Sequence, residues 1–219
     1  MVGDATAQPA QAVPAQAGLR ERKKLATRQA LGWAALRLAG ERGLEHVRIE
    51  DIAAAANVSP RTFNNYFSSK EEAIVALAVE RATQVGPALR ARPADEPLAA
   101  ALGAVFVQQY SGLGEPDKAW VTQIRLAASS PALLGAYLSA LVRCERALAE
   151  AIAVRTGTDA ARDLAPRVLA AAAFGAARVA LQHWLTTNRT TRLADVLRRA
   201  IDQVVCGTPP LTPDGEPTP

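Results

Sequence analysis

The sequence is poor in the side chains that build metal sites, redox centres and catalytic groups. Two cysteines, Cys144 and Cys206, and two histidines, His46 and His183, are spread over 219 residues. Neither cysteine lies at a metal or redox spacing, and neither histidine has a second ligand at the spacing of a zinc site. Glycine-rich phosphate loops and nucleophile elbows are also missing. We therefore expect no cofactor, no metal and no enzyme activity, and two free thiols in a reducing compartment.

Long apolar runs and strand-like alternation are absent as well. No stretch of about twenty consecutive apolar residues occurs, as a membrane-spanning helix would need. The most apolar segment, "VLAAAAFGAARVALQHWL" over residues 168–185, is mostly alanine and contains Arg178, which is typical of a core helix. The N-terminus lacks a charged start followed by an apolar run, so no secretion signal is predicted. We expect an all-α, cytoplasmic protein with no membrane partner.

The basic residues are unevenly distributed along the chain. The net charge is only +4, yet residues 19–37 contain six arginines and lysines against Glu21 alone, so the remainder is close to balanced. A basic segment at one end of a neutral protein is typical of a polyanion partner. A solvated helix start would give the same composition, so charge alone leaves both interpretations open.

Helical periodicity and breakers divide the chain into a small head and a larger body. Residues 1–18 and 208–219, rich in alanine, proline or glycine, are predicted to be disordered tails. Residues 19–72 form the head, with helices over about 21–39, 49–56 and 60–67, and residues 73–207 form the body. A fourth helix from Ser69 to about Val85 joins them before a linker over residues 86–97. Further helices are predicted at 97–111, 117–129, 131–156, 159–187 and 190–206.

The third predicted helix has one apolar and one unusual polar face. Ser59 is a good N-cap and Pro60 suits the first helical position, where its missing N–H costs nothing. Phe63 and Phe67 are four residues apart and share a face that needs burial. The opposite side carries Pro60, Arg61, Asn64 and Asn65. An ordinary solvated face would favour glutamate and lysine instead.

This polar face has the chemistry of base recognition in DNA. Arginine can bridge the O6 and N7 atoms of guanine, and asparagine the N6 and N7 atoms of adenine, in the major groove. The hydroxyls of Thr62 and Tyr66 suit phosphate oxygens, and Lys70 lies at a helix start that favours anions. Two helices joined by a short turn, the second carrying these side chains, indicate a helix-turn-helix. The alternative is that Asn64 and Asn65 are ordinary exposed residues.

The segment "IEDIAAAANVSPRTFNNYFSSKEEAIVAL", residues 49–77, resembles the DNA-binding segment of the TetR family of bacterial transcriptional regulators. The resemblance extends from about Leu19 and includes "AALRLAGERG". It implies that Thr62, Tyr66 and Lys70 hold phosphates. The DNA-binding residues expected on both grounds are Arg48, Ser59, Pro60, Arg61, Thr62, Asn64, Asn65, Tyr66 and Lys70.

Two positions depart from the family pattern. Asn64 stands where an aromatic residue is common, so a usual backbone contact is replaced by a side chain suited to a base. Arg48 stands where the family often has the threonine that caps the second helix, and the absence of such a cap typically costs about 1 kcal/mol. Arg48 could reach a phosphate instead, or be a plain surface arginine.

The resemblance also implies a homodimer formed through the last two helices and a small-molecule pocket in each body. Residues 168–181 are apolar on every side except at Arg178, which fits a dimer interface, although a core within one chain would give the same pattern. Bulky or charged side chains among the alanines are the candidate pocket walls: Phe106, Tyr110, Trp120, Arg125, Tyr137, Phe174, Arg178 and Trp184. Most could be plain core, and Arg178 could equally form a salt bridge. The body resembles the subgroup with an acyl-CoA-like ligand domain, that of the mycofactocin-system regulators.

We therefore expect a ligand-responsive regulator that binds a palindromic double-stranded DNA operator as a homodimer. Repression relieved by a small, largely apolar effector is the favoured mode, and activation remains an alternative. The fourth helix is the expected lever between effector and DNA. A helical ligand carrier without DNA binding is the rival interpretation, but it leaves the basic segment and the Arg–Asn helix unexplained.

Overall fold

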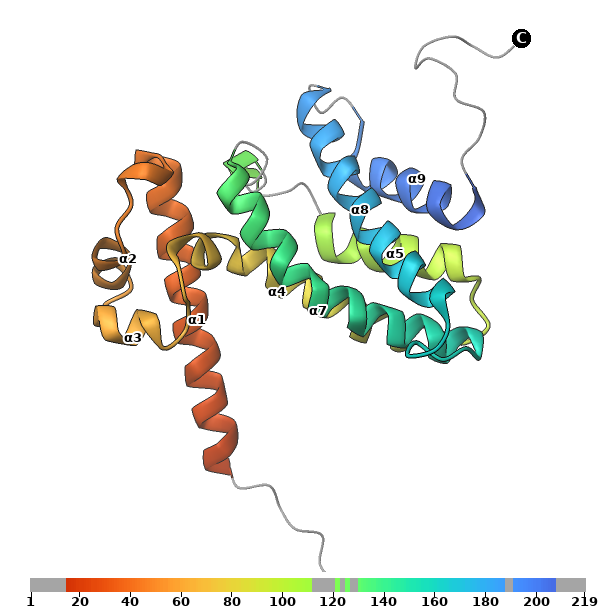
Figure 1. The fold of residues 1–219 in the computed structure, drawn as a ribbon, viewed down its shortest axis with the longest axis horizontal. Coiled ribbons are helices and arrows are strands. Elements are labelled where there is room, and N and C mark those ends of the chain that lie inside the picture. Colours follow the sequence, from red (N-terminus) through yellow and green to blue (C-terminus); the bar gives the residue numbers. More distant parts are fainter. Residues whose placement is uncertain (1–14, 112–120, 123–124, 127–129, 188–190, 208–219) are drawn as a thin grey trace, which may run out of the picture.

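The computed structural model describes residues 15–111, 121–122, 125–126, 130–187 and 191–207. Within these ranges the regular structure is helical, which confirms the all-α fold class (Figure 1). The elements are α1 (Ala15–Arg42), the 3-10 helix η1 (Leu44–His46), α2 (Ile49–Ala55), α3 (Pro60–Asn64), α4 (Lys70–Arg90), α5 (Leu98–Ser111), α7 (Pro131–Thr156), α8 (Leu164–Thr186) and α9 (Leu193–Cys206).

The head is built from α1, α2, α3 and the first half of α4 around one apolar core. Leu31 and Leu38 of α1 and Ile52 of α2 are fully or almost fully buried in it. Leu133, near the start of α7, is buried in the same cluster. The head core is therefore closed partly by a body helix, which fixes the head to the body at two helices, α4 and α7.

The body packs α5, α7, α8, α9 and the second half of α4 around a separate core. The helices α4 and α7 lie alongside each other, and α5 and α8 pack against α9 (Figure 1). The approach of α4 to α7 is close at Gly86, where an added Cβ would lie 2.9 Å from the carbonyl oxygen of Ala147. A glycine at this position lets the two helix backbones meet.

Several element boundaries differ from the sequence-based prediction, and the first is α3, which ends at Asn64 and not at Phe67. The helix α1 begins at Ala15, so residues 15–18 belong to it and not to a tail. The helix α8 begins at Leu164 after a turn over residues 159–163, with Asp163 at its N-cap position. The predicted linker starts too early, because α4 continues through Pro87 to Arg90. A residue before proline usually avoids helical geometry because its Cβ clashes, and Gly86 has no Cβ.

The remaining body predictions are confirmed where the structure describes them. The helix predicted over residues 131–156 is α7, and those predicted near 97–111 and 190–206 are α5 and α9. Of the helix predicted over 117–129, residues 121–122 and 125–126 are helical, and the others lie outside the described ranges. The helix α8 is long and apolar enough by composition to cross a membrane, but it packs against α7 and α9 as a body helix.

Candidate nucleic-acid interface

The short helix α3 presents the polar face that the sequence predicts. Phe63 is fully buried and Phe67 is 2% exposed, and their ring centroids lie 5.7 Å apart in the head core. Arg61, Asn64 and Asn65 are exposed on the outer side of the head. An arginine and two amides are thus held together at the surface by two buried aromatic rings.

The start of α3 is fixed by the side chain of Ser59. Its Oγ accepts a hydrogen bond from the N–H of Thr62 at 3.1 Å and lies 2.9 Å from the Thr62 hydroxyl. Pro60 occupies the first helical turn, as predicted. The Thr62 hydroxyl, predicted to hold a phosphate, therefore already has a partner within the turn. Either hydroxyl can donate in this contact, and when Ser59 donates, the Thr62 O–H stays free to donate to a phosphate oxygen.

The start of α2 shows how the chain manages without a threonine cap. Arg48 is the exposed residue before α2, and its backbone N–H donates to the Asp51 carboxylate at 3.3 Å. Asp51 also lies in the first helical turn, where a negative charge is favoured. The guanidinium of Arg48 remains at the surface of the head.

Lys70 has partners that its sequence position did not reveal. Its ammonium donates to the carbonyl oxygen of Leu44 at 2.8 Å and to that of Val47 at 3.0 Å. These carbonyls belong to η1 and the extended residue that follows it, 23 and more residues earlier in the chain. Lys70 thus ties the start of α4 to the loop before α2. One of its three N–H donors is left for a phosphate.

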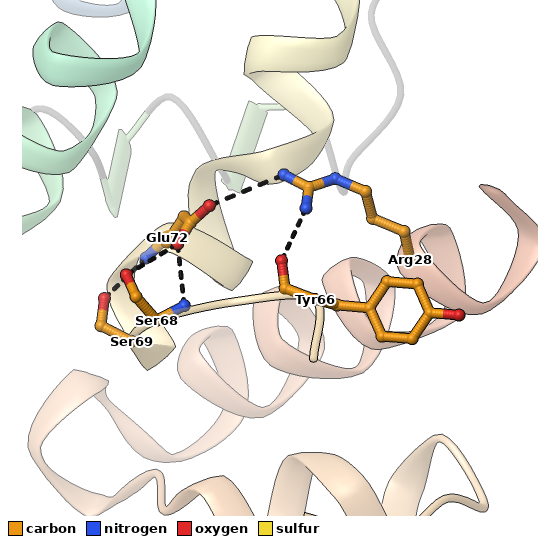
Figure 2. A network of polar contacts seen from close by, with 5 residues as sticks. All are labelled: Arg28, Tyr66, Ser68, Ser69 and Glu72. Atoms are coloured by element: carbon orange, nitrogen blue, oxygen red, sulfur yellow. Dashed lines mark hydrogen bonds and ion pairs between the residues drawn. The ribbon is translucent and has the colours of Figure 1, made fainter. Parts of the chain in front are cut away.

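Arg28 of α1 clamps the segment that follows α3 (Figure 2). Its guanidinium donates to the carbonyl oxygen of Tyr66 at 2.8 Å and lies 3.8 Å from the Glu72 carboxylate. It also lies over the Phe67 ring, 4.3 Å from the centroid. Sequence reasoning counted Arg28 only as one of six basic residues. Arg28 lies four residues beyond Lys24, at the edge of the apolar stripe of α1, and this position could have indicated that it packs against the head.

Ser69 and Glu72 have the Ser-x-x-Glu spacing of a capping box at the start of α4, but the structure shows only half of it. Ser69 does accept from the N–H of Glu72, at 3.1 Å, as a capping serine should. The carboxylate of Glu72, however, accepts from the N–H and hydroxyl of Ser68, each at 2.9 Å, and not from Ser69 (Figure 2). Glu72 therefore contacts both Ser68 and Arg28, and links α1 to the turn between α3 and α4.

The aromatic residues predicted as pocket walls form a packed group in the body. Phe106 stacks on Tyr110 at 5.8 Å and meets Phe174 edge-on at 5.3 Å. The Tyr110 and Tyr137 hydroxyls lie 3.4 Å apart. Burial raises the pKa of Tyr110 well above its ordinary value and also raises the pKa of Tyr137. Both hydroxyls are therefore neutral and able to donate hydrogen bonds at physiological pH.

Two other predicted wall residues border this group, because Trp184 belongs to the same apolar cluster and the charge of Arg178 acts on Tyr137. Trp184 is 3% exposed, and its indole N–H donates to the carbonyl oxygen of Thr191 at 2.9 Å. Arg178 is half-buried and donates to the Gln182 side chain at 3.3 Å. Arg125 is exposed, and Trp120 lies outside the described residues. The effector site stays a prediction for all of these residues.

Two surface hollows lie on or beside the head. One, of about 940 Å³, lies beside α1 and the end of α2, and Trp33 and Asn57 are among its lining residues. The other, of about 320 Å³, is lined from α1, α4 and α5 by residues that include Trp33, Glu80 and Gln109. None of the predicted pocket walls that the structure describes lines either hollow. Among the described residues, no group of three or more histidine, cysteine or acidic side chains could hold a metal ion.

Comparison with known proteins decides which family has this head and body. The family model "Bacterial regulatory proteins, tetR family" matches residues 33–77, and the model "MftR C-terminal domain" matches residues 96–209. The HTH-type transcriptional regulator TcmR of Streptomyces glaucescens is 38% identical over 177 residues, 76% of each chain. The chain belongs to the TetR family. It is therefore a DNA-binding transcriptional regulator and not an enzyme.

Solved structures, including a repressor of the TetR family, share its fold. The Thermus thermophilus FadR repressor in complex with lauroyl-CoA matches with a TM-score of 0.56 and 20% identity, covering 88% of this chain and all of that one. The Bacillus subtilis FadR in complex with stearoyl-CoA matches with a TM-score of 0.54 and 18% identity, over 82% of this chain and 98% of that one. A SmeT–triclosan complex matches with a TM-score of 0.56 and 19% identity, over 89% and 99%.

Proposed function

We propose that this TetR-family regulator is a repressor that binds a palindromic operator as a homodimer and is released by a small, largely apolar effector. The observation that supports DNA recognition is the exposed face of α3, where Arg61, Asn64 and Asn65 stand on a helix fastened by Phe63 and Phe67. Arginine and asparagine on the surface of α3, the second helix of the helix-turn-helix, are suited to guanine and adenine in the major groove.

The test of this interface begins with selection of bound fragments from genomic DNA by the purified protein. A shared inverted repeat in the recovered fragments identifies the operator, and the neighbouring genes indicate the pathway. Asn64→Ala and Arg61→Ala then weaken binding at particular base pairs, by about 1–3 kcal/mol for each bidentate hydrogen-bond pair that is removed. Affinities are measured on a panel of single-base-pair operator variants. An equal loss of affinity for every sequence with Asn64→Ala contradicts a role for Asn64 in base recognition.

The dimer is proposed to form through α8 and α9. Along α8, Leu164, Val168 and Val179 are exposed to 71%, 54% and 54% within one chain. Together with Gly175, which has no neighbour within 4 Å of its would-be Cβ, they follow one helical stripe. An exposed apolar stripe this long is typical of a surface that a partner covers. Two-fold symmetry then matches a palindromic operator.

The effector is proposed to bind the body and to act through α4. The relatives with acyl-CoA or triclosan bound have the same fold, and the neutral hydroxyls of Tyr110 and Tyr137 are polar groups within an apolar body. An effector that favours the conformation with misplaced heads lowers operator affinity by linkage. Spin labels on the two α3 helices measure the head separation. Abolished DNA binding with an unchanged head separation contradicts this mechanism.

Repression rather than activation is supported by the repressor among the structural relatives, and the experiment that separates the two is direct. In a purified transcription assay on the recovered operator, the protein lowers transcript yield and the effector restores it. A rise in yield on adding the protein identifies an activator. Because the partner is chromosomal DNA, the proposed location is the cytoplasm.

A further inference from the structure

The N-terminal part of α1 extends beyond the head. Residues 18–26 are all exposed, and the first buried residue of the helix is Leu31. In Figure 1 this part of α1 projects past α3, on the side of the head away from α8 and α9. The extension stays helical because it continues a helix that the head has already nucleated, so it needs no nucleus of its own.

The face of α1 that packs into the head is apolar within the head and becomes basic where the helix extends beyond the head. Leu31 and Leu38 lie on this face and are buried in the head core. Lys24 lies seven residues before Leu31, and Arg20 lies four residues before Lys24. Both spacings keep side chains on one side of a helix, so Arg20 and Lys24 continue this face. Beyond the head, an apolar packing surface is thus replaced by two long cationic side chains. Among the described residues, neither forms an ion pair with an acidic side chain.

Arg28 fixes where this change occurs relative to the DNA-facing helix. It is one turn beyond Lys24, and its guanidinium holds the carbonyl oxygen of Tyr66, just after α3. With a rise of about 1.5 Å per residue, Lys24 and Arg20 lie roughly 6 and 12 Å further along the helix axis, past the end of α3. The basic stripe therefore begins one helical turn beyond the contact of Arg28 with Tyr66, the residue that follows the C-cap of α3.

We propose that Arg20 and Lys24 bind backbone phosphates of the DNA flanking the half-site that α3 contacts. The inference rests on the proposed operator binding and extends it to a second, sequence-independent contact on each subunit. Phosphates are the partner that matches the charge, because residues 20–24 hold four cations and Glu21 alone. Such contacts raise affinity for every sequence through counterion release and set the length of DNA that the dimer covers.

The test compares two double variants that remove the same charge. Arg20→Gln with Lys24→Gln changes the proposed face. Arg22→Gln with Arg42→Gln is the control, because Arg22 lies on the opposite face of the extension and Arg42 at the other end of α1. Glutamine keeps a high helix propensity, which circular dichroism verifies. Binding is measured by fluorescence anisotropy over a series of KCl concentrations. The probes are a duplex recovered from the genomic selection with ten base pairs on each flank, and the same duplex trimmed to the half-sites.

On the long duplex, R20Q/K24Q makes the negative slope of log K against log salt less steep, by about 0.9 for each phosphate that is no longer bound. The control variant keeps a slope close to that of wild type. On the trimmed duplex, wild type and R20Q/K24Q bind alike. Equal reductions for both double variants, or a reduction that persists on the trimmed duplex, overturn the inference. If the wild-type protein selects no DNA at all, it is the proposed function that fails. Specific wild-type binding with an unaffected R20Q/K24Q variant refutes the flanking contact alone.

Discussion

At the scale of single residues, Lys70 combines a structural and a proposed electrostatic role. Two of its N–H donors hold the carbonyl oxygens of Leu44 and Val47, which position the loop before α2. A lysine at this point of the chain therefore shapes the head before any DNA is present. The two roles predict different measurements, because removing the hydrogen bonds to the carbonyls lowers stability, whereas removing a phosphate-binding charge lowers the salt dependence of binding.

Lys70→Met is expected to lower the free energy of unfolding by about 2 kcal/mol, because two carbonyls are deprived of a charged donor. Urea denaturation followed by circular dichroism measures the change. The control Lys24→Met, on the exposed extension of α1, is expected to stay within about 0.5 kcal/mol of wild type. In DNA binding, Lys70→Met also lowers the salt slope by about one for each subunit that held a phosphate. Unchanged stability would contradict the structural role.

Tyr110 provides a prediction for alkaline pH. Burial raises the pKa of Tyr110 above its ordinary value in the folded state, whereas a tyrosine in the unfolded chain has a pKa of about 10. Above about pH 10 the unfolded state therefore binds fewer protons than the folded state, so the free energy of unfolding falls as the pH rises. Tyr110→Phe removes this contribution and makes the fall shallower. Urea titrations at about pH 8 and about pH 10.5 measure it, and identical pH slopes for the two proteins would refute the assignment.

The sequence predicts side chains whose role follows from local spacing. Phe63 and Phe67 are both buried as predicted, although Phe67 lies three residues beyond the end of α3, and Ser59 caps α3 because of its position before Pro60. The partners of Lys70 and Arg28 lie 23 to 44 residues away in the chain. Helical periodicity reports the face of one helix only, so contacts that depend on how two helices meet were not predicted.

At the scale of elements, Gly86 sets how closely α4 approaches α7. Gly86→Ala is expected to lower the free energy of unfolding by about 1–3 kcal/mol, because the new methyl group meets the Ala147 backbone and the helices must separate. Gly135→Ala is the matched control, since Gly135 lies within α7 with no atom within 4 Å of its would-be Cβ. The free energy of unfolding of this control is expected to rise by up to about 1 kcal/mol, because alanine has a higher helix propensity than glycine. Changes of the same sign would contradict the close approach.

Helix boundaries follow from the sequence where a breaker or cap marks them. The helix α7 runs from Pro131 to Thr156 as predicted, because Ser130 caps its start and Gly157, in the left-handed conformation, follows its end. The end of α4 was missed, because Pro87 looks like a breaker when its neighbour is ignored. The start of α1 was also missed, because an alanine-rich segment with little charge has no periodic face to indicate a helix.

At the scale of the whole molecule, the stripe on α8 predicts how the assembly responds to one charge. Val179→Glu places a carboxylate in the proposed dimer interface and is expected to yield monomers in sedimentation velocity, with weaker operator binding. Val142→Glu is the control and is expected to stay dimeric, because Val142 is exposed to 63% on α7, next to Arg143 and one turn before Arg146. A dimeric Val179→Glu protein would place the interface elsewhere.

The attachment of the head to two body helices has a geometrical consequence. Because Leu133 of α7 is embedded in the head core and α4 meets α7 at Gly86, the head turns only together with this helix pair. From Gly86 to Lys70 the helix spans roughly 24 Å at about 1.5 Å per residue. A rotation of about six degrees about Gly86 then carries the head about 2.5 Å sideways, and the two-fold symmetry of the proposed homodimer doubles the change in separation to about 5 Å. Angular differences too small to disturb the packing of either core are thus enough to put two α3 helices out of register with successive turns of DNA.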